Sequence, residues 1–164
     1  MINVSIILPD IRSTHNVGSI FRSAEIFGVK HIYICGYTPY PKIDNDKRLP
    51  HVSNKLDKQI SKTALGTEKL VPFSYFSTAE QAIDQAKQDG CQILALEQNT
   101  NSILLDKAEF KNKVAIILGR EVEGIDPNII KLSDFCIEIP QIGTKESLNV
   151  SNACAIMLYH ISTI

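Results

Sequence analysis

Short apolar runs alternate with segments of helical periodicity along the whole 164-residue sequence. Apolar residues spaced three and four apart predict helices at residues 16–27, 78–88 and 148–161, with shorter ones at 61–66 and after Pro127. The apolar runs predict strands at residues 4–8, 31–35, 69–75, 92–96, 114–118 and 134–139. Several runs are apolar on both faces, which is typical of parallel strands buried between helices. The sequence therefore predicts one α/β domain over residues 1–164, a parallel-sheet α/β/α sandwich.

Residues 36–57 interrupt this alternation with a polar stretch that contains Pro39, Pro41 and Pro50. We expect a long surface loop here, and long ordered loops are usually functional.

Charge is distributed unevenly along the chain. Residues 1–70 hold 10 Lys and Arg against 6 Asp and Glu, whereas residues 71–164 hold 7 Lys and Arg against 12 Asp and Glu. The positive bias favours contact of the N-terminal part with phosphates, although a chance distribution accounts for it equally well.

Composition and missing motifs argue against several classes of protein. No apolar run approaches the roughly 20 residues of a membrane helix, and the first residues do not resemble a signal peptide, so we expect a cytoplasmic protein. The four cysteines form no C-x-x-C pair and the four histidines show no ligand spacing, so we expect no metal site. The glycine-rich phosphate motifs of dehydrogenases and P-loop nucleotidases are missing, which disfavours a generic α/β nucleotide-binding enzyme.

Three polar, glycine-bearing segments follow predicted strands: NVGSIFR at 16–22, GREVEG at 119–124 and IPQIGTKESLNVS at 139–151. In open α/β sheets, ligands bind at the carboxyl ends of the strands, where such segments lie. Each segment taken singly has a structural explanation as a helix cap or a turn, with Ser147 or Asn149 capping the last helix.

Taken together, the three segments resemble the signature motifs of the SpoU (TrmH-type) branch of the SPOUT RNA methyltransferases, and the resemblance covers almost the whole chain. It implies a deep trefoil knot near the C-terminus, a rare topology that periodicity cannot predict. It also implies S-adenosylmethionine bound in the knot, a homodimer, and transfer of a methyl group to a ribose 2′-oxygen of tRNA or rRNA. Arg120 and Asn152 depart from the family pattern, so no role is assigned to them.

The resemblance also assigns roles to residues. Methyl transfer to a ribose hydroxyl requires a positioned nucleophile and stabilisation of the developing alkoxide. The permanently charged, planar guanidinium of Arg22 suits that task and can also grip a phosphate. The remaining residues implied in catalysis are Asn16, Glu121, Ser147 and Asn149, although a structural ion pair also accounts for Glu121. The cofactor is expected to contact backbone groups and apolar side chains at Leu96, Gly119, Ile139, Gly143 and Leu148, where glycine permits close approach.

We expect no extra N-terminal RNA-binding domain of the kind that some relatives have, and therefore expect the domain itself to bind RNA. The expected contacts are the basic residues of the first third of the chain: Arg12, Lys47, Arg48, Lys55, Lys58 and Lys62. The alternative is a knotted RNA-binding protein that has lost catalysis. The presence of Arg22 and Glu121 at the motif positions favours the enzyme.

Overall fold

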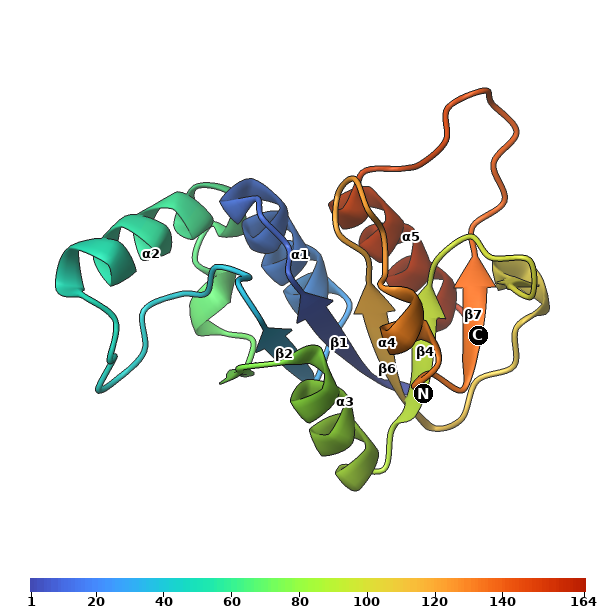
Figure 1. Cartoon of the computed structure of the whole chain (residues 1–164), viewed down its shortest axis with the longest axis horizontal. Helices are drawn as coiled ribbons and strands as arrows, with labels where there is room; N and C mark the ends of the chain where they lie inside the picture. The colour runs from blue at the N-terminus through green and yellow to red at the C-terminus, as the bar shows by residue number, and fades with distance from the viewer.

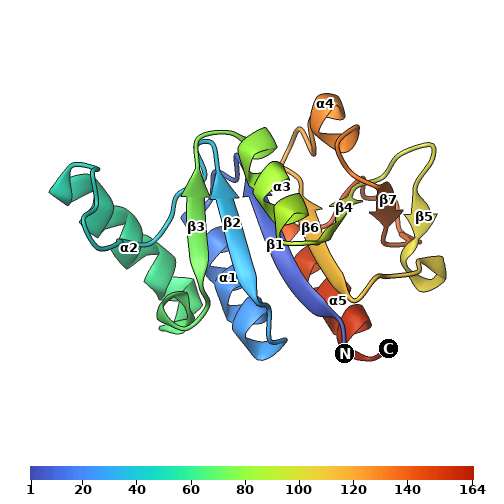
Figure 2. The same cartoon turned by 90° about the horizontal axis from the view of Figure 1, so that it is seen from below.

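The computed structural model describes all residues 1–164 and contains one parallel sheet of seven strands. Their order in the sheet is β3-β2-β1-β6-β4-β7-β5, so that β1, β6 and β4 form its centre (Figures 1 and 2). The parallel sheet and the α/β class are as predicted. The strands are β1 Asn3–Pro9, β2 His31–Cys35, β3 Phe73–Phe76, β4 Gln92–Leu96, β5 Ile103–Leu104, β6 Lys113–Leu118 and β7 Phe135–Glu138.

Helices cover both faces of the sheet, as Figure 2 shows. α1 (Thr14–Ile26) and α5 (Val150–Ser162) lie on one face, and α3 (Ala79–Gln88) and α4 (Pro127–Ile130) lie on the other. α2 (Pro50–Ala64) packs against α1 beyond the β3 edge, and two short 3₁₀ helices cover Thr67–Lys69 and Leu105–Lys107. Gly18 permits the close approach of α1 to α2, since a Cβ at this position would collide with Thr63 and with the Ile60 carbonyl.

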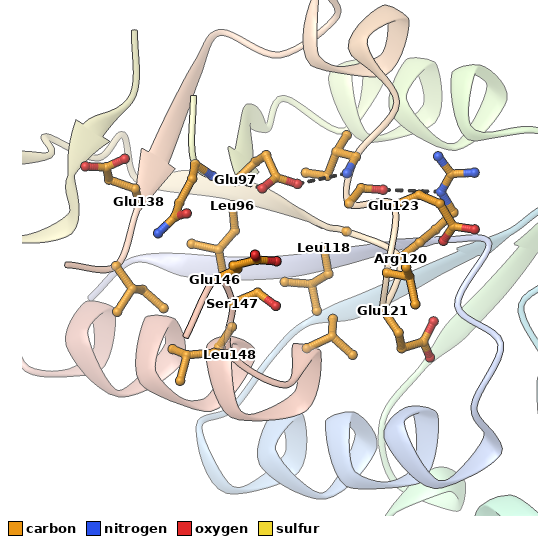
Figure 3. A pocket seen from close by; sticks show the side chains of 18 of the residues that line it. Leu96, Glu97, Leu118, Arg120, Glu121, Glu123, Glu138, Glu146, Ser147 and Leu148 are labelled. Atoms are coloured by element: carbon orange, nitrogen blue, oxygen red, sulfur yellow. Dashed lines mark hydrogen bonds between the residues drawn. The ribbon is translucent and has the colours of Figure 1, made fainter. Parts of the chain in front are cut away.

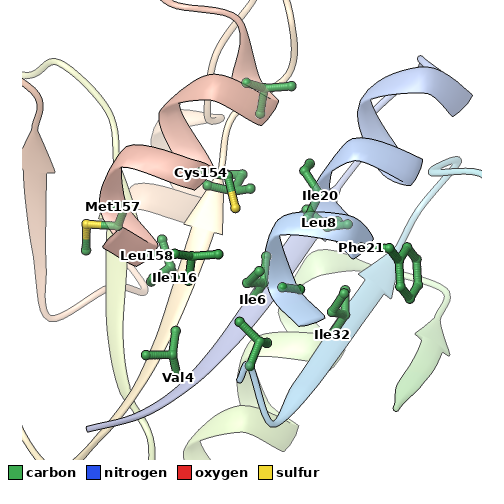
Figure 4. Packing of buried hydrophobic residues seen from close by; sticks show 14 of the residues in the cluster. Val4, Ile6, Leu8, Ile20, Phe21, Ile32, Ile116, Cys154, Met157 and Leu158 are labelled. Atoms are coloured by element: carbon green, nitrogen blue, oxygen red, sulfur yellow. The ribbon is translucent and has the colours of Figure 1, made fainter. Parts of the chain in front are cut away.

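The alternation of side chains along the strands divides the buried residues into two clusters. In β1, Ile6 and Leu8 pack beneath α1 and α5, whereas Ile7 faces α3 and α4. Figure 4 shows the first cluster, in which Phe21 and Met157 are completely buried. Burial of such a side chain stabilises a fold by roughly 1.5–3 kcal/mol. Because a cluster of this kind packs on each face of the sheet, the strands and their ends are held in fixed positions.

The predicted element boundaries are wrong in one region. The polar stretch 36–57 is a loop only as far as Leu49, because α2 begins at Pro50 and continues to Ala64, replacing both the end of the predicted loop and the short helix at 61–66. The predicted strand at 69–75 begins later, at Phe73, after a 3₁₀ turn. β5, with only two residues, was not predicted at all.

The cysteines behave as small apolar residues. Cys35, Cys136 and Cys154 are buried, Cys91 is partly buried, and all four are free thiols. Burial raises the pKa of the Cys35 and Cys154 thiols to about 12, so these two groups remain uncharged at neutral pH. No helix combines the length and the apolar character that crossing a membrane requires.

Candidate functional site

A cavity of about 450 Å³ lies at the carboxyl ends of β4, β6 and β7 (Figure 3). Three loops enclose it: residues 96–98 after β4, residues 118–125 after β6, and the segment from the end of β7 to the start of α5. The volume is within the range of small-molecule sites in proteins, which is roughly 300–1,000 Å³. The position is the one that open α/β sheets use for ligands.

The structure brings together most of the residues predicted to hold a cofactor. Leu96, Gly119, Ile139 and Leu148 all line the cavity, and so do Glu121 and Ser147 from the predicted catalytic set. Gly143 does not line it, and a Cβ built at Gly143 would meet no atom within 4 Å. Close approach of a ligand therefore gives no reason for glycine at position 143 in this structure.

Asn16, Glu121 and Asn149 come from the three motif segments and are linked by hydrogen bonds. The Asn16 amide Nδ2 donates to Glu121 Oε1 at 3.1 Å, and the Asn16 Oδ1 accepts from the Asn149 Nδ2 at 3.2 Å. Asn149 also caps α5, because its Oδ1 accepts from the Ser151 N–H at 2.9 Å. The cap predicted for Asn149 is thus confirmed, and the same side chain joins the third segment to the first.

Glu121 is held as a carboxylate at the start of α1. Its two oxygens accept from the backbone N–H groups of Arg12 and Ser13, at 3.3 and 3.1 Å, in addition to the Asn16 amide. Burial opposes the charged form, but the donors, with Ser13 the strongest, outweigh it and lower the pKa of Glu121 below its ordinary value. A negative charge is also favoured beside a helix N-terminus.

Replacement of Glu121 by glutamine is expected to make stability less dependent on pH. The lowered pKa of Glu121 means that its stabilising effect is complete above the ordinary glutamate range and is lost as pH falls through the folded-state pKa. At pH 7 we expect Glu121→Gln to lower the unfolding free energy by about 1–2 kcal/mol, because an amide nitrogen faces donors. In thermal melts, the difference in melting temperature between Glu121→Gln and wild type should shrink as the pH is lowered from 7 to 3. A difference that stays constant over this range would contradict the role of Glu121.

Arg22 lies outside the cavity, on the exposed side of α1. The ion pair with Glu121 that would have explained both residues structurally is not present, since the Arg22 side chain forms no ion pair or hydrogen bond within the chain. A separation of six residues on a helix turns Arg22 well away from Asn16. Arg22 is therefore free to contact something outside its own chain.

Glu97 and Arg120, to which the sequence analysis assigned no role, hold the second motif loop (residues 119–124) in place. Glu97 Oε2 accepts from the Ile125 N–H at 2.9 Å, and its carboxylate lies where a Cβ on Gly124 would be. Gly124 has φ +70°, so both its conformation and its surroundings favour glycine. The backbones of Arg120 and Gly124 exchange two hydrogen bonds at 3.2 Å, and the Arg120 Nε donates to the Gly124 carbonyl. Glu97 directly follows a buried strand, a signal that could have identified it.

The cavity is acidic, which the sequence analysis also missed. Arg120 is the only basic residue that lines it. Figure 3 shows carboxylates arranged around the cavity from several different loops. The five that line it are Glu97, Glu121, Glu123, Glu138 and Glu146. Such a surplus of negative charge favours a ligand that carries positive charge.

The residues predicted to contact RNA fall into two groups. Lys47, Lys55, Lys58 and Lys62 are exposed, and none of them forms an ion pair. Arg48 is different, because its guanidinium pairs with Asp46, donates to the carbonyls of Tyr40 and Pro41, and lies 3.6 Å from the Tyr40 ring centre. In this structure Arg48 holds the 36–49 loop, and its contact with RNA stays a prediction.

Arg12 is intermediate between these two groups. Its side chain is 65% exposed and pairs with Glu123 at 3.0 Å. An exposed pair of this kind contributes little to stability and exchanges readily, so Arg12 remains able to meet a phosphate.

The fold and the cavity define an α/β protein with a cavity of small-ligand size at the carboxyl ends of its strands. Comparison with known proteins identifies the family. The model of the SpoU rRNA Methylase family matches residues 3–159, and the chain belongs to this family.

Similar proteins include curated relatives and solved structures. The chain is 28% identical to a tRNA (guanosine(18)-2′-O)-methyltransferase of Borreliella burgdorferi over 96% of its own length, and 30% identical to a 23S rRNA (guanosine-2′-O-)-methyltransferase of Coxiella burnetii over 95%. It spans 65% and 56% of the lengths of these relatives. The fold also matches the AdoMet-bound rRNA methyltransferase from Sinorhizobium meliloti with a TM-score of 0.78 and 23% identity, covering 96% of this chain and 55% of that one.

Proposed function

We propose that the protein transfers a methyl group from S-adenosylmethionine to a ribose 2′-oxygen of tRNA or rRNA. The observation that carries this proposal is the cavity at the ends of β4, β6 and β7. Glu121 lines it, and Asn16 and Asn149, which do not line it, are joined to Glu121 by hydrogen bonds at its edge, Asn149 through Asn16. The names of the relatives from Borreliella burgdorferi and Coxiella burnetii, both 2′-O-methyltransferases of RNA, support the same reaction.

The residues of the cavity fit S-adenosylmethionine. Leu96, Leu118, Ile139 and Leu148 provide apolar surface suited to an adenine ring. The surrounding carboxylates match the positive charge of a sulfonium, which is lost when the methyl group leaves. The chemistry that this cofactor supplies when bound is a methyl group on a positively charged sulfur, open to attack by a nucleophile. We propose Leu96, Gly119, Ile139 and Leu148 as its main contacts.

The charge argument predicts that Glu146→Gln distinguishes the cofactor from its product. Glu146 is exposed beside the cavity and accepts no hydrogen bond, so its contribution to binding is electrostatic. We expect the substitution to weaken S-adenosylmethionine binding by about two- to fivefold and to leave S-adenosylhomocysteine, which lacks the sulfonium charge, unchanged. Calorimetric titration of both compounds measures the effect. Equal weakening of the two would show that Glu146 acts by shape or contact instead of charge.

Positioning and charge stabilisation are the two contributions that this chain makes to the reaction. The 2′-hydroxyl is a poor nucleophile, because its proton leaves only far above neutral pH. We propose that Asn16, Ser147 and Asn149 orient the ribose at the mouth of the cavity, with Glu121 fixing Asn16. Arg22 would then stabilise the alkoxide as it develops and hold the adjoining phosphate, while the proton leaves through phosphate or water.

We propose that Arg22 serves the cavity of a second copy in a homodimer. Arg22 does not line the cavity of its own chain and has no partner there. One helical turn further along α1, Ile26 is 64% exposed, and the adjacent α5 exposes Ile156 and Tyr159. Large apolar side chains gathered on two neighbouring helices suit a symmetric interface, which would carry each Arg22 toward the partner.

We also propose that the chain forms a trefoil knot. The support is the strand order, in which β7 lies between β4 and β5 although it follows both in sequence. The chain reaches β7 from α4 on one face of the sheet and leaves it toward α5 on the other (Figure 2). The segment from β4 through β5 to β6 passes around the outside of β7. A strand that enters such a loop on one face and leaves on the other threads it.

The RNA is proposed to contact the exposed face of α2. Lys55, Lys58 and Lys62 follow one another at spacings of three and four residues, so their ammonium groups share one side of the helix. A row of unpaired lysines suits a phosphate backbone, which is bound through charge and without reading sequence. Lys47 belongs to the loop that precedes α2, and Arg12 lines a cavity together with Gln59 of α2, so both are proposed to contact the same RNA.

The test of the proposed function is incubation with S-adenosylmethionine labelled in its methyl group together with total tRNA and rRNA, followed by digestion to nucleosides. The expected product is a labelled 2′-O-methylnucleoside. Label in a base would assign a different acceptor atom. Tight RNA binding with no transfer, while S-adenosylmethionine fails to bind, would favour the alternative of an RNA-binding protein without catalysis.

A further inference from the structure

A second cavity, of about 570 Å³, lies between the N-terminal turn of α1, the loop after β2 and the side of α2. We propose that it holds one unpaired nucleotide of an RNA strand, next to the nucleotide that is methylated. This inference rests on the proposed function, because an RNA substrate is what would bring a strand to this face. None of the residues expected to hold the cofactor lines this cavity.

Aromatic rings form one wall of the second cavity. Tyr37 and Tyr75 both line it, and their rings remain open to a ligand, with Tyr37 54% and Tyr75 41% exposed. The wall is rigid, because Tyr75 stacks on Tyr40 with ring centres 4.5 Å apart and Arg48 covers the other face of Tyr40. Exposed aromatic rings held in place are the surfaces on which unpaired bases stack, whatever the base.

Donors suited to a phosphate line the same cavity, beside the ring of Tyr37. The Arg12 guanidinium is largely exposed there, and the Thr14 N–H belongs to the first turn of α1, where it donates to no group of the chain. A backbone amide at a helix N-terminus and a nearby arginine together make a suitable phosphate contact. The cavity thus presents aromatic rings next to a guanidinium and a free backbone N–H, which match the base and the phosphate of one nucleotide.

The second cavity is connected to the candidate active site on one side and to the lysine row on the other. The Arg12 and Ser13 backbone amides bind Glu121, which lines the first cavity, while both residues line the second. Gln59 lines the second cavity from α2, and Lys55 and Lys62 are its neighbours on the same helix. A strand held at the active site would therefore pass through this cavity before its phosphates reach the lysines.

The test uses the full chain and a fluorescein-labelled single-stranded RNA, decauridylate, with binding followed by anisotropy. Tyr37→Ala is expected to weaken binding by about 5- to 100-fold, since it removes a stacking surface, while Tyr37→Phe remains within about twofold of wild type. The Tyr37 hydroxyl lies beside the Arg12 guanidinium, so Tyr37→Phe, which removes only this hydroxyl, isolates the loss of that contact from the loss of the stacking surface. The Tyr37 backbone N–H, which donates to Asp10, is unaffected by either substitution. A thermal melt checks each variant.

A charge variant and its matched control complete the experiment. Arg12→Gln is expected to reduce the slope of log affinity against log salt by about one, whereas Lys111→Gln, an exposed lysine distant from the cavity, should change neither slope nor affinity. Decauridylate binding within twofold of wild type in Tyr37→Ala would overturn the proposal. Uridine monophosphate that binds as tightly as decauridylate would also overturn it and assign the cavity to a free nucleotide.

The outcomes separate this inference from the proposed function. Tyr37-dependent binding of decauridylate without S-adenosylmethionine binding would retain the RNA subsite and reject the methyltransferase. Labelled methyl transfer with an unchanged KM for RNA in Tyr37→Ala would retain the methyltransferase and reject the subsite.

Discussion

Replacement of Arg22 by alanine is expected to lower the rate of ribose methylation by about 10²–10³-fold, the usual cost of removing one preorganised charge contact to a transition state. The affinity for S-adenosylmethionine and the melting temperature should remain nearly unchanged, because Arg22 does not line the cofactor cavity and its side chain bonds to no residue of its chain. Single-turnover transfer to RNA, calorimetry and a thermal melt on the same variant measure the three quantities.

Two further variants sharpen this test. Arg22→Lys should restore little activity, because an ammonium group cannot reproduce the two-pronged contact of a guanidinium. Lys30→Ala, which removes an exposed cation at the opposite end of the strands, serves as the matched control and should methylate at the wild-type rate. Turnover of Arg22→Ala within a few-fold of wild type would show that the assignment of Arg22 is wrong.

Mixing two inactive variants is expected to restore about a quarter of the wild-type activity. One variant is Arg22→Ala, and the other is Leu148→Arg, which places a bulky cation in the cofactor cavity at a position already 41% exposed. When equal amounts pair at random, half of the dimers are mixed, and each mixed dimer combines one intact cavity with an intact Arg22 from the partner. Activity of the refolded or exchanged mixture measures the effect.

The mixing experiment distinguishes two arrangements of the site. If Arg22 served the cavity of its own chain, a mixed dimer would contain no complete site, and the mixture would stay inactive. Sedimentation velocity must show a dimer in both variants. Ile156→Asp, which places a charge in the exposed apolar face of α5, should yield monomers without transfer activity. A fully active monomer would contradict the shared site.

The parallel sheet could be predicted from the sequence because its central strands are apolar on both faces. α2 was missed because its apolar residues are few: Val52, Leu56, Ile60 and Ala64 recur every four residues among polar ones. Their spacing and Pro50 at the first helical turn were the available signals. β5 could not be predicted, since a two-residue strand has no periodicity and forms only because β7 is beside it.

The candidate site, like the fold, could be predicted from the sequence only in part. Motif residues at the ends of strands converge because parallel strands end at the same edge, which is why Leu96, Gly119 and Leu148 line one cavity. The bonds of Asn16 to Glu121 and Asn149 depend on how three loops fold back on one another, and no local pattern encodes this. The side of α1 that carries Arg22 follows from the helix period, but what that side faces does not.

The insertion of β7 between β4 and β5 has a consequence for synthesis of the protein. Until residues 135–138 have left the ribosome, β4 has one unpaired edge and β5 has no partner in the sheet. An uncovered apolar strand such as β4 can pair with another chain, so nascent or prematurely ended chains are the aggregation-prone species. The strand that completes the sheet is the last of the seven to be translated, so the yield of native protein depends on protection of the β4 edge until elongation has passed residue 138.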